Sequence, residues 1–451
     1  MDYMEEYRRK LITPEQAAAM VKSGDVVELY GYNCSGQALD RALASRVNEL
    51  ESVTIRTMVS RLEWECLKAD PAGKVFVDNS PFMGKEVLQA TTAQNRVANP
   101  AMLYEFPLIY RRGDWPTDFG SIQVSPPDKD GYMYFTFSAA YTKAIAESVK
   151  CFMPEVNEQF YPLVNFHPDA RIHVSEVPYI IKGGSPAPGL RPPVSFGENE
   201  RKIAEYVYRE MQDGCCIQIG TGAVPAAIAA VLSESDLKDL GVHTEFLSDS
   251  IMLLDQAGLI NGSKKALQKG LMTTSILNGT AEFMDYVKDN VEKFYVAPSD
   301  YVNDPYVVGQ MDNFISVNGC LEIDLQGQVN SESIQTRQIS GSGGQLDFIL
   351  GAYRSKGGKS ILCCNSTYRK KDGTIASKIH AALPKGACCT TPRSAVQYVC
   401  TEQGIANLKG RSVWERAELL VGLAHPDFRD GLIAEAEDMG IWKPSNKRGE
   451  Q

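Results

Sequence analysis

The spacing of apolar residues in the second half of the chain predicts helices that alternate with strands. Residues 199–211 place apolar side chains four apart, which lines one face of a helix. Residues 215–219 form a mainly apolar run of strand length, and glycines then mark a turn. Pro225 suits the first turn of the Ala-rich helix that follows, because a backbone N–H has no helical partner there. Strand, glycine loop and helix together make one α/β unit.

A similar passage occurs in the first half of the chain. Residues 24–30 predict a strand, glycines mark a loop, and a helix is expected from about Gln37. Further strands are predicted at residues 293–297, 314–318, 360–364 and 395–401, with helical stretches between them. This mixed order favours an α/β fold with doubly wound sheets, and the two similar units hint at two similar halves.

The length and one proline-rich stretch predict the domain organisation. A chain of 451 residues exceeds the usual size of a single core, so two domains are expected. The stretch KGGSPAPGLRPP, residues 182–193, concentrates glycine and proline and is typical of a linker. We therefore expect an N-terminal domain over residues 1–182, a linker over 183–198 and a C-terminal domain over 199–451.

Composition and charge exclude several classes of function. A net charge of −10 argues against nucleic-acid and anionic-membrane partners, because both require a basic face. The chain has no apolar run of about 20 residues that would span a membrane, and its first residues, MDYMEEYRRK, are charged, which predicts a cytoplasmic protein. Six of the eleven cysteines form adjacent pairs, which suit disulfides poorly and fit a reducing compartment. Five scattered histidines lack the spacing of a zinc site, so we expect no metal.

Two segments carry candidate chemistry at the ends of predicted strands. The loop GTGAVP, residues 220–225, leads into a helix N-terminus, where backbone N–H groups favour an anion. It lacks the third glycine of a dinucleotide fingerprint and the ending of a P-loop, so a simple tight turn is the alternative. Glu245 closes a short predicted strand, and ligands of α/β sheets meet the carboxyl ends of strands. An ordinary surface carboxylate is the alternative there.

A third segment, SGSGGQLDFILGAYRSKGGKS, spans residues 340–360. Backbone N–H groups in its glycine run can converge on an oxyanion. Its cations Arg354, Lys356 and Lys359 form the local basic patch that an acidic protein needs for an anionic ligand. A flexible surface loop is the alternative. By local pattern alone, Asn303 in YVNDP is a turn residue.

Taken in order, these segments resemble the acetyl-CoA hydrolase/transferase family over nearly the whole chain. The resemblance runs through VSPPDKDGY, EVNEQ, IHVSEVPYI, GTGAVP, GVHTEF, YVNDP, the glycine-rich segment, YVCTEQGIANLKGRS and AHPDFRDGL. It implies two similar open α/β domains with the active site between them, and a homodimer. It also implies CoA thioesters and carboxylates as substrates, with no permanently bound cofactor.

The resemblance further implies roles for individual residues. Glu245, in the motif His243-Thr244-Glu245, would be the nucleophile that carries CoA as a covalent thioester. The residues implied to stabilise the oxyanion or contact the thioester are Gly343, Gly344 and Asn303. The residues implied to contact CoA are Gly220, Thr221, Gly222, Ala223, Val224, Cys320 and Gly341. Lys359, from the basic patch, is a further expected CoA contact.

The branch of the family stays open at this point. Transfer of CoA between butyryl-CoA and acetate is the preferred function, with 4-hydroxybutyrate CoA-transfer and acyl-CoA hydrolysis as alternatives that use the same glutamate. A non-catalytic sensor of CoA esters is a further alternative. Thr221 and Val224 stand where Ile is common, and Phe246 where Met is common, so the acyl-chain preference is the property that these positions affect.

Overall fold

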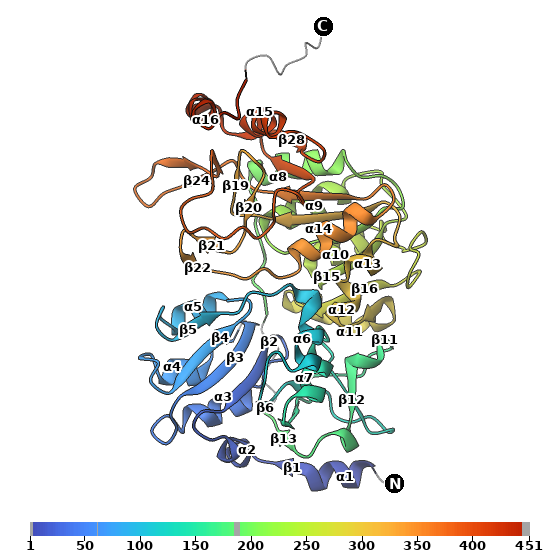
Figure 1. Cartoon of the computed structure of the whole chain (residues 1–451). Coiled ribbons are helices and arrows are strands. Elements are labelled where there is room, and N and C mark those ends of the chain that lie inside the picture. Colours follow the sequence, from blue (N-terminus) through green and yellow to red (C-terminus); the bar gives the residue numbers. More distant parts are fainter. Residues whose placement is uncertain (1–2, 61, 185–189, 444–451) are drawn as a thin grey trace.

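The computed structural model describes residues 3–60, 62–184 and 190–443 of the chain. Two sheets dominate the molecule (Figure 1). The smaller sheet comes from the first part of the chain, drawn in blue, and the larger sheet comes mainly from the second part, drawn in green to red. The predicted architecture of two α/β units is confirmed. Part of the expected linker, residues 185–189, lies outside the described residues.

The smaller sheet has six parallel strands among the described residues. Their order is β5 (Arg96–Ala98), β4 (Phe76–Ser80), β3 (Val53–Ser60), β2 (Val26–Tyr32), β6 (Phe119–Gly120) and β9 (Cys151–Phe152). Its helices are α2 (Pro14–Met20), α3 (Gln37–Ala44), α4 (Glu65–Ala69), α5 (Lys85–Ala90), α6 (Phe106–Arg112) and α7 (Thr142–Ser148). β2 and α3 confirm the strand and helix predicted here, with the strand two residues later than expected.

The larger sheet has nine strands within the described ranges. Their order is β11 (Asn165–Phe166), β17 (Phe294–Val296), β16 (Met272–Leu277), β15 (Gly241–Leu247), β14 (Cys216–Ile219), β18 (Phe314–Gly319), β23 (Lys359–Cys363), β27 (Tyr398–Thr401) and β28 (Gly404–Asn407). Neighbours pair in parallel except β27 and β28. β11 belongs to residues 1–182, so the chain ahead of the expected linker also supplies the outermost strand of this sheet.

Helices cover the larger sheet, and its central strands are buried on both faces. Every residue of β14 and β16 is buried, as expected for parallel strands covered on both sides. The helices are α8 (Glu198–Tyr208), α9 (Ala223–Ser233), α10 (Asp249–Gln256), α11 (Ala281–Asp289), α12 (Ser299–Val302), α13 (Pro305–Val308), α14 (Gln345–Arg354), α15 (Val413–Leu423) and α16 (Pro426–Asp438). α8 and α9 confirm the two helices predicted around the first glycine loop.

Smaller elements complete the described part of the chain. They are α1 (Tyr3–Lys10), a four-stranded sheet of β1 (Leu11–Ile12), β13 (Ile180–Lys182), β10 (Glu155–Val156) and β7 (Gln123–Val124), and the pair β8 (Tyr132–Tyr134) and β12 (Arg171–His173). Further short strands are β19 (Glu322–Asp324), β20 (Val329–Asn330), β21 (Ser333–Ile334), β22 (Arg337–Gln338), β24 (Thr367–Arg369), β25 (Ile375–Ser377) and β26 (Ile379–His380). All eleven cysteines are free thiols. None of the helices in the described ranges is long and apolar enough to span a membrane.

Hydrogen bonds and one shared core fix the two sheets against each other. Asn33 Nδ2, just beyond β2, donates to Leu277 O at 3.1 Å, and Asn278 Nδ2 donates to Asn33 Oδ1 at 2.8 Å. The backbone N–H of Ala139 donates to Ser275 O at 3.0 Å. Buried side chains from both sheets form a continuous apolar cluster. The site between the sheets is therefore built on a fixed frame.

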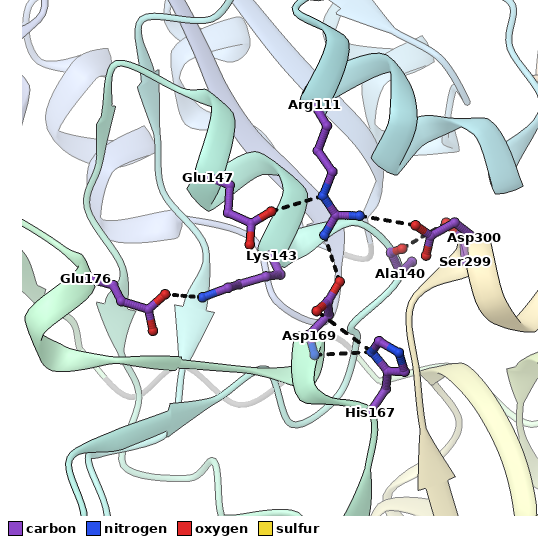
Figure 2. Close-up of polar contacts among 9 residues, drawn as sticks. All are labelled: Arg111, Ala140, Lys143, Glu147, His167, Asp169, Glu176, Ser299 and Asp300. Carbon is purple, nitrogen blue, oxygen red and sulfur yellow. Dashed lines mark hydrogen bonds and ion pairs between the residues drawn. The ribbon is translucent and has the colours of Figure 1, made fainter.

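A cluster of charges around Arg111 also joins the two parts (Figure 2). The guanidinium of Arg111, on α6, contacts Glu147 at 3.0 Å, Asp169 at 2.7 Å and Asp300 at 3.2 Å. Asp300 belongs to α12 of the larger unit, and the neighbouring Ser299 donates from Oγ to Ala140 O at 2.8 Å. α12 is thus held from the N-terminal side, and this short helix leads directly into the candidate residue Asn303.

Candidate active site

The carboxyl edge of the larger sheet gathers most of the candidate residues. β14 ends before the loop of residues 220–222, β15 carries Glu245, and β18 is followed by Cys320. The three strands are parallel neighbours, so their carboxyl ends lie at one edge. The topology therefore brings together segments that are far apart in the sequence.

Glu245 is half-buried, and its carboxylate faces the second glycine loop, which comprises residues 341–344. Asn303 Nδ2 donates to Glu245 Oε2 at 2.8 Å, and the backbone N–H of Gly344 donates to the same carboxylate. A Cβ atom at position 344 would lie 2.0 Å from Glu245 Oε2 and 2.2 Å from Asn303 Nδ2. Glycine lets the backbone approach the carboxylate closely, and any side chain here would have to displace the Glu245 carboxylate and the Asn303 amide.

Burial makes Glu245 an unusual carboxylate. It raises the pKa of Glu245 from 4.5 to about 7, although the hydrogen bonds from Asn303 and Gly344 act to lower it. Charge at this position is therefore less well solvated than on the surface. A carboxylate in that state is a better nucleophile than a fully hydrated one once it is ionised.

Asn303 owes its position to α12 and to a second carboxylate. It caps the C-terminus of α12 and is completely buried, and its Nδ2 also contacts Asp347 Oδ2 at 3.2 Å. His243 supports the same helix, since its Nε2–H donates to Val302 O at 2.7 Å. Burial and the nearby Lys265 lower the pKa of His243 to about 3, so the imidazole is neutral and acts as a structural support.

The second glycine loop packs against the N-terminal part of the chain. A Cβ atom on Gly341 would lie 2.1 Å from Pro81 O, and one on Gly343 would lie 3.0 Å from the Phe82 ring. Gly343 also has φ +56°, in the left-handed region, and its carbonyl accepts from Leu103 N at 3.1 Å. These two glycines seat the loop, and Gly344 faces Glu245.

An aromatic wall lies beside the nucleophile. The Tyr32 ring, at the end of β2, packs edge-on against Phe246 with centroids 5.3 Å apart, and Arg191 lies 5.7 Å from the Phe246 ring. Burial and the Glu245 charge raise the pKa of Tyr32, so its hydroxyl stays protonated. Tyr32 has φ +53°, a strained conformation for a bulky residue and one that is concentrated at functional sites.

A largely apolar cavity of about 670 Å³ adjoins the first glycine loop. The N-cap residues of three helices line it: Gly222 of α9, Ser248 of α10 and Thr280 of α11. Arg191 adds a cation, Asp249 and Glu282 add carboxylates, and the apolar lining includes Leu190, Val194, Phe196, Met252 and Leu253. Such a cavity combines helix dipoles that favour an anion with an apolar surface.

The cation patch expected near the second loop is not at this site. Lys359 begins β23, so it lies at the amino edge of the sheet, where its Nζ contacts Glu210 Oε2 at 2.7 Å. Arg354 ends α14, about 15 Å along the helix from its start beside Glu245, and it stacks on Tyr306 at 5.6 Å. The sequence brings these residues close together along the chain, but α14 carries them away from the carboxyl edge.

Cys320 and the first glycine loop lie at the carboxyl edge. Cys320 is half-buried after β18, and its N–H donates to Cys363 O at 3.0 Å. In the first loop Thr221 is exposed, and Gly222 has φ +126°, which requires glycine whatever the space around it. Within the described ranges, no group of three or more His, Cys, Asp or Glu side chains is placed to hold a metal ion.

Some site residues have no distinct signal in the sequence. Pro81 and Phe82 come from the smaller sheet, and Tyr104 donates its backbone N–H to Asp347 Oδ2 at 3.1 Å. Asp347 itself follows the glycine run, and a carboxylate in the first turn of a helix suggests only a dipole interaction. These contacts depend on how the two sheets meet, which local patterns do not encode.

Comparison with known proteins agrees with this arrangement. The acetyl-CoA hydrolase/transferase N-terminal domain matches residues 1–186 and the C-terminal domain of the same family matches residues 279–436. A probable butyrate:acetyl-CoA coenzyme A-transferase from Syntrophomonas wolfei is 41% identical over 99% of both chains. A 4-hydroxybutyrate coenzyme A transferase from Clostridium kluyveri is 39% identical over 96% of this chain and 99% of its own.

A solved structure agrees as well. RipA from Yersinia pestis is 32% identical, with a TM-score of 0.87 over 98% of this chain and 100% of its own. The resemblance inferred from the motifs is thereby confirmed. On the two matched domains and the full-length relatives, the chain belongs to the acetyl-CoA hydrolase/transferase family.

Proposed function

We propose that this protein transfers CoA between a short-chain acyl-CoA, preferably butyryl-CoA, and acetate, and that Glu245 carries the CoA in transit. The observation that carries the proposal is the placement of Glu245 at the carboxyl edge. Its carboxylate accepts from Asn303 at 2.8 Å and from the Gly344 N–H, and the cavity lined by Gly222 and Ser248 lies at the same edge of the sheet and can hold a long ligand.

In the proposed reaction the Glu245 carboxylate carries first the acyl group and then CoA. A Glu245 oxygen attacks the thioester carbonyl, the C–S bond breaks, and CoA thiolate leaves as a mixed anhydride forms. The thiolate then attacks the Glu245 carbonyl carbon and expels the first carboxylate, which leaves a Glu245–CoA thioester. Acetate attacks this thioester, and the same two steps in reverse produce acetyl-CoA and free Glu245.

The donors around Glu245 suit the charge that develops on it. When thiolate attacks the acylated glutamate, the former carboxylate oxygen becomes an oxyanion. The Gly344 N–H and the Asn303 amide already donate to this carboxyl group in the free protein. A preorganised donor of this kind contributes about 3 kcal/mol to the transition state.

The cavity beside the first glycine loop suits the CoA handle. The helix N-termini at Gly222 and Ser248, together with Arg191, favour phosphate groups, and the apolar lining suits the pantetheine arm. The N-terminus of α11 is already occupied by the Asp249 carboxylate, which accepts from the Thr280 N–H. Binding energy from this remote part of the substrate can hold the thioester against Glu245. These residues replace the patch around Lys359 as the proposed CoA contacts.

The acyl preference rests on the relatives and on the aromatic wall. Tyr32 and Phe246 give the acyl group an apolar neighbour, which fits an uncharged butyryl chain. 4-Hydroxybutyrate is the second candidate, because the relative from Clostridium kluyveri carries that name at 39% identity. A panel of acyl-CoA donors with acetate as acceptor distinguishes the two by kcat/KM.

The decisive experiment removes the nucleophile. Glu245→Gln should abolish CoA transfer, whereas Glu437→Gln, an exposed glutamate on α16, should leave it unchanged. Butyryl-CoA without acceptor should leave a CoA adduct on the Glu245 peptide of the native enzyme, detected by mass spectrometry. An active Glu245→Gln enzyme would refute the mechanism, and free CoA released steadily without acetate would indicate hydrolysis instead.

A further inference from the structure

The side chains of Asp347 and Asn303 share one hydrogen bond, and each has a further oxygen atom without a partner in the described part of the chain. Asn303 Nδ2 lies 3.2 Å from Asp347 Oδ2. One oxygen of each side chain, Asp347 Oδ1 and Asn303 Oδ1, is buried and has no hydrogen-bond partner in the described part of the chain. Both are acceptors when Asp347 is ionised, so neither can satisfy the other.

One proton resolves both unsatisfied oxygens. A carboxylic acid and an amide are both planar and can pair side by side, with N–H donating to C=O in one direction and O–H donating to C=O in the other. The contact between Asn303 Nδ2 and Asp347 Oδ2 is the first of these bonds. A proton on Asp347 Oδ1 supplies the second, to Asn303 Oδ1. Buried polar atoms are rarely left unpaired, which favours the protonated form.

The surroundings of Asp347 also disfavour a negative charge. The charged and titratable groups near it are Glu245 on β15, Glu105 and Tyr104 on η1 (Leu103–Glu105), and Asp304 beside Tyr104. None of these groups is a cation. Asp347 is fully buried, and burial followed by the Glu245 charge raises its pKa well above 3.8. The hydrogen bonds from Asn303 Nδ2 and from the Tyr104 N–H lower this pKa but are outweighed.

We propose that Asp347 is a protonated positioning residue, which locks the Asn303 amide by a two-point acid–amide pair and thereby directs the second N–H of Asn303 to Glu245. The Asn303 amide carries two N–H groups, one for Asp347 Oδ2 and one for Glu245 Oε2. With its carbonyl oxygen also held, the amide cannot turn over and present that oxygen to the nucleophile. The proposal rests on Glu245 as the nucleophile and adds an alkaline limit to its activity.

The alkaline limit follows from the loss of this one proton. Ionised Asp347 would place a second negative charge across Asn303 from Glu245, and the bond to Asn303 Oδ1 would be lost. The repulsion would disfavour the oxyanion that forms on Glu245, and the amide would be free to turn. We therefore expect kcat to fall at high pH in the native enzyme, while KM for acyl-CoA changes little.

Two variants of Asp347 test the proposal. Asp347→Asn keeps a donor and an acceptor but cannot ionise, so kcat at neutral pH should stay within about threefold of the native value and its alkaline fall should disappear. Asp347→Leu keeps similar size without a donor, and kcat should drop by about 10- to 100-fold at every pH, the loss expected when a catalytic group is misplaced. An Asp347→Asn enzyme as weak as Asp347→Leu would overturn the proposal, and so would one that keeps the alkaline fall.

An infrared measurement tests the proton itself and does not depend on turnover. The difference spectrum between native protein and Asp347→Asn at pH 8 should contain the carbonyl stretch of a neutral carboxylic acid. Only a carboxylate band in that spectrum would overturn the proposal, even if Asp347→Leu fails to fold. The Glu245→Gln experiment fails or succeeds separately, because it reports the covalent intermediate and not the Asp347 proton.

Discussion

Substitution of Gly344 by alanine places one methyl group against the nucleophile. The added Cβ would lie 2.0 Å from Glu245 Oε2 and 2.2 Å from Asn303 Nδ2, more than 1 Å inside ordinary van der Waals contact, which begins at about 3.4 Å. The backbone conformation of Gly344, with φ −93°, is open to alanine, so the chain should fold. The effect is therefore expected on the reaction and not on the fold.

The contacts set the size of the effect. To make room, the Glu245 carboxyl must move by about 1 Å and separate from the Gly344 N–H and the Asn303 amide. Loss of one such donor typically costs about 10² to 10³ in kcat, and a misplacement of about 1 Å costs about 10². We expect kcat to fall at least 100-fold, with KM for acyl-CoA within about threefold, because the cavity beside Gly222 is not touched.

The assay compares steady-state transfer from butyryl-CoA to acetate in Gly344→Ala and Gly431→Ala. Gly431 is a matched control, since it lies in the interior of α16 and has open space where its Cβ would be. That change should leave kcat unaltered and raise the free energy of unfolding by about 0.5–1 kcal/mol. Full activity in Gly344→Ala, with normal thermal unfolding, would show that the Gly344 loop does not contact the reacting carboxylate.

Three further predictions concern charge. Because the pKa of Glu245 is about 7 and only its anion attacks, kcat should fall nearly tenfold per pH unit below pH 6, and a midpoint near 4.5 in the kcat profile would contradict the burial argument. Lys359→Ala should leave KM for acyl-CoA unchanged. It should lower the free energy of unfolding in a denaturant titration by at most about 1 kcal/mol, because the ion pair with Glu210 is lost. A tenfold rise in KM would show that Lys359 contacts CoA. Arg111→Ala should lower kcat several-fold, because α12 loses its contact through Asp300. The same change should lower the free energy of unfolding by about 1–3 kcal/mol, since three partly exposed ion pairs are lost. An unchanged kcat would show that Asp300 does not hold the helix.

The elements that depend on local patterning could be predicted from the sequence. The four-residue spacing in 199–211, the apolar run before the first glycine loop and Pro225 locate α8, β14 and α9 to within a few residues. Each signal arises within about ten residues of chain, where periodicity and turn chemistry decide the structure. The motif around Glu245 depended on the family, since an isolated glutamate at a strand end has no distinctive pattern.

The contacts between the two units could not be predicted in this way. Local composition predicted that N–H groups of the glycine run bind an oxyanion and that the nearby cations bind an anionic ligand at the same site. In the structure Gly341 and Gly343 fit against Pro81 and Phe82, Gly344 faces Glu245, and α14 carries the cations to the far edge. A run of similar residues in sequence is separated in space whenever a helix lies between them, because ten helical residues span about 15 Å.

The surroundings of the reactive carboxylate come from both units, and buried polar groups of both units meet there. Glu245 belongs to the larger sheet, but the loop that faces it is seated on Phe82, and Asp347 is held by the backbone of Tyr104. If the smaller unit shifted, Phe82 and Tyr104 would no longer hold the loop of Gly344 and Asp347 in place beside Glu245. The buried hydrogen bonds between Asn33 and Asn278 and the shared apolar core resist that shift. The same interface that stabilises the fold thus fixes the geometry on which nucleophilic attack depends.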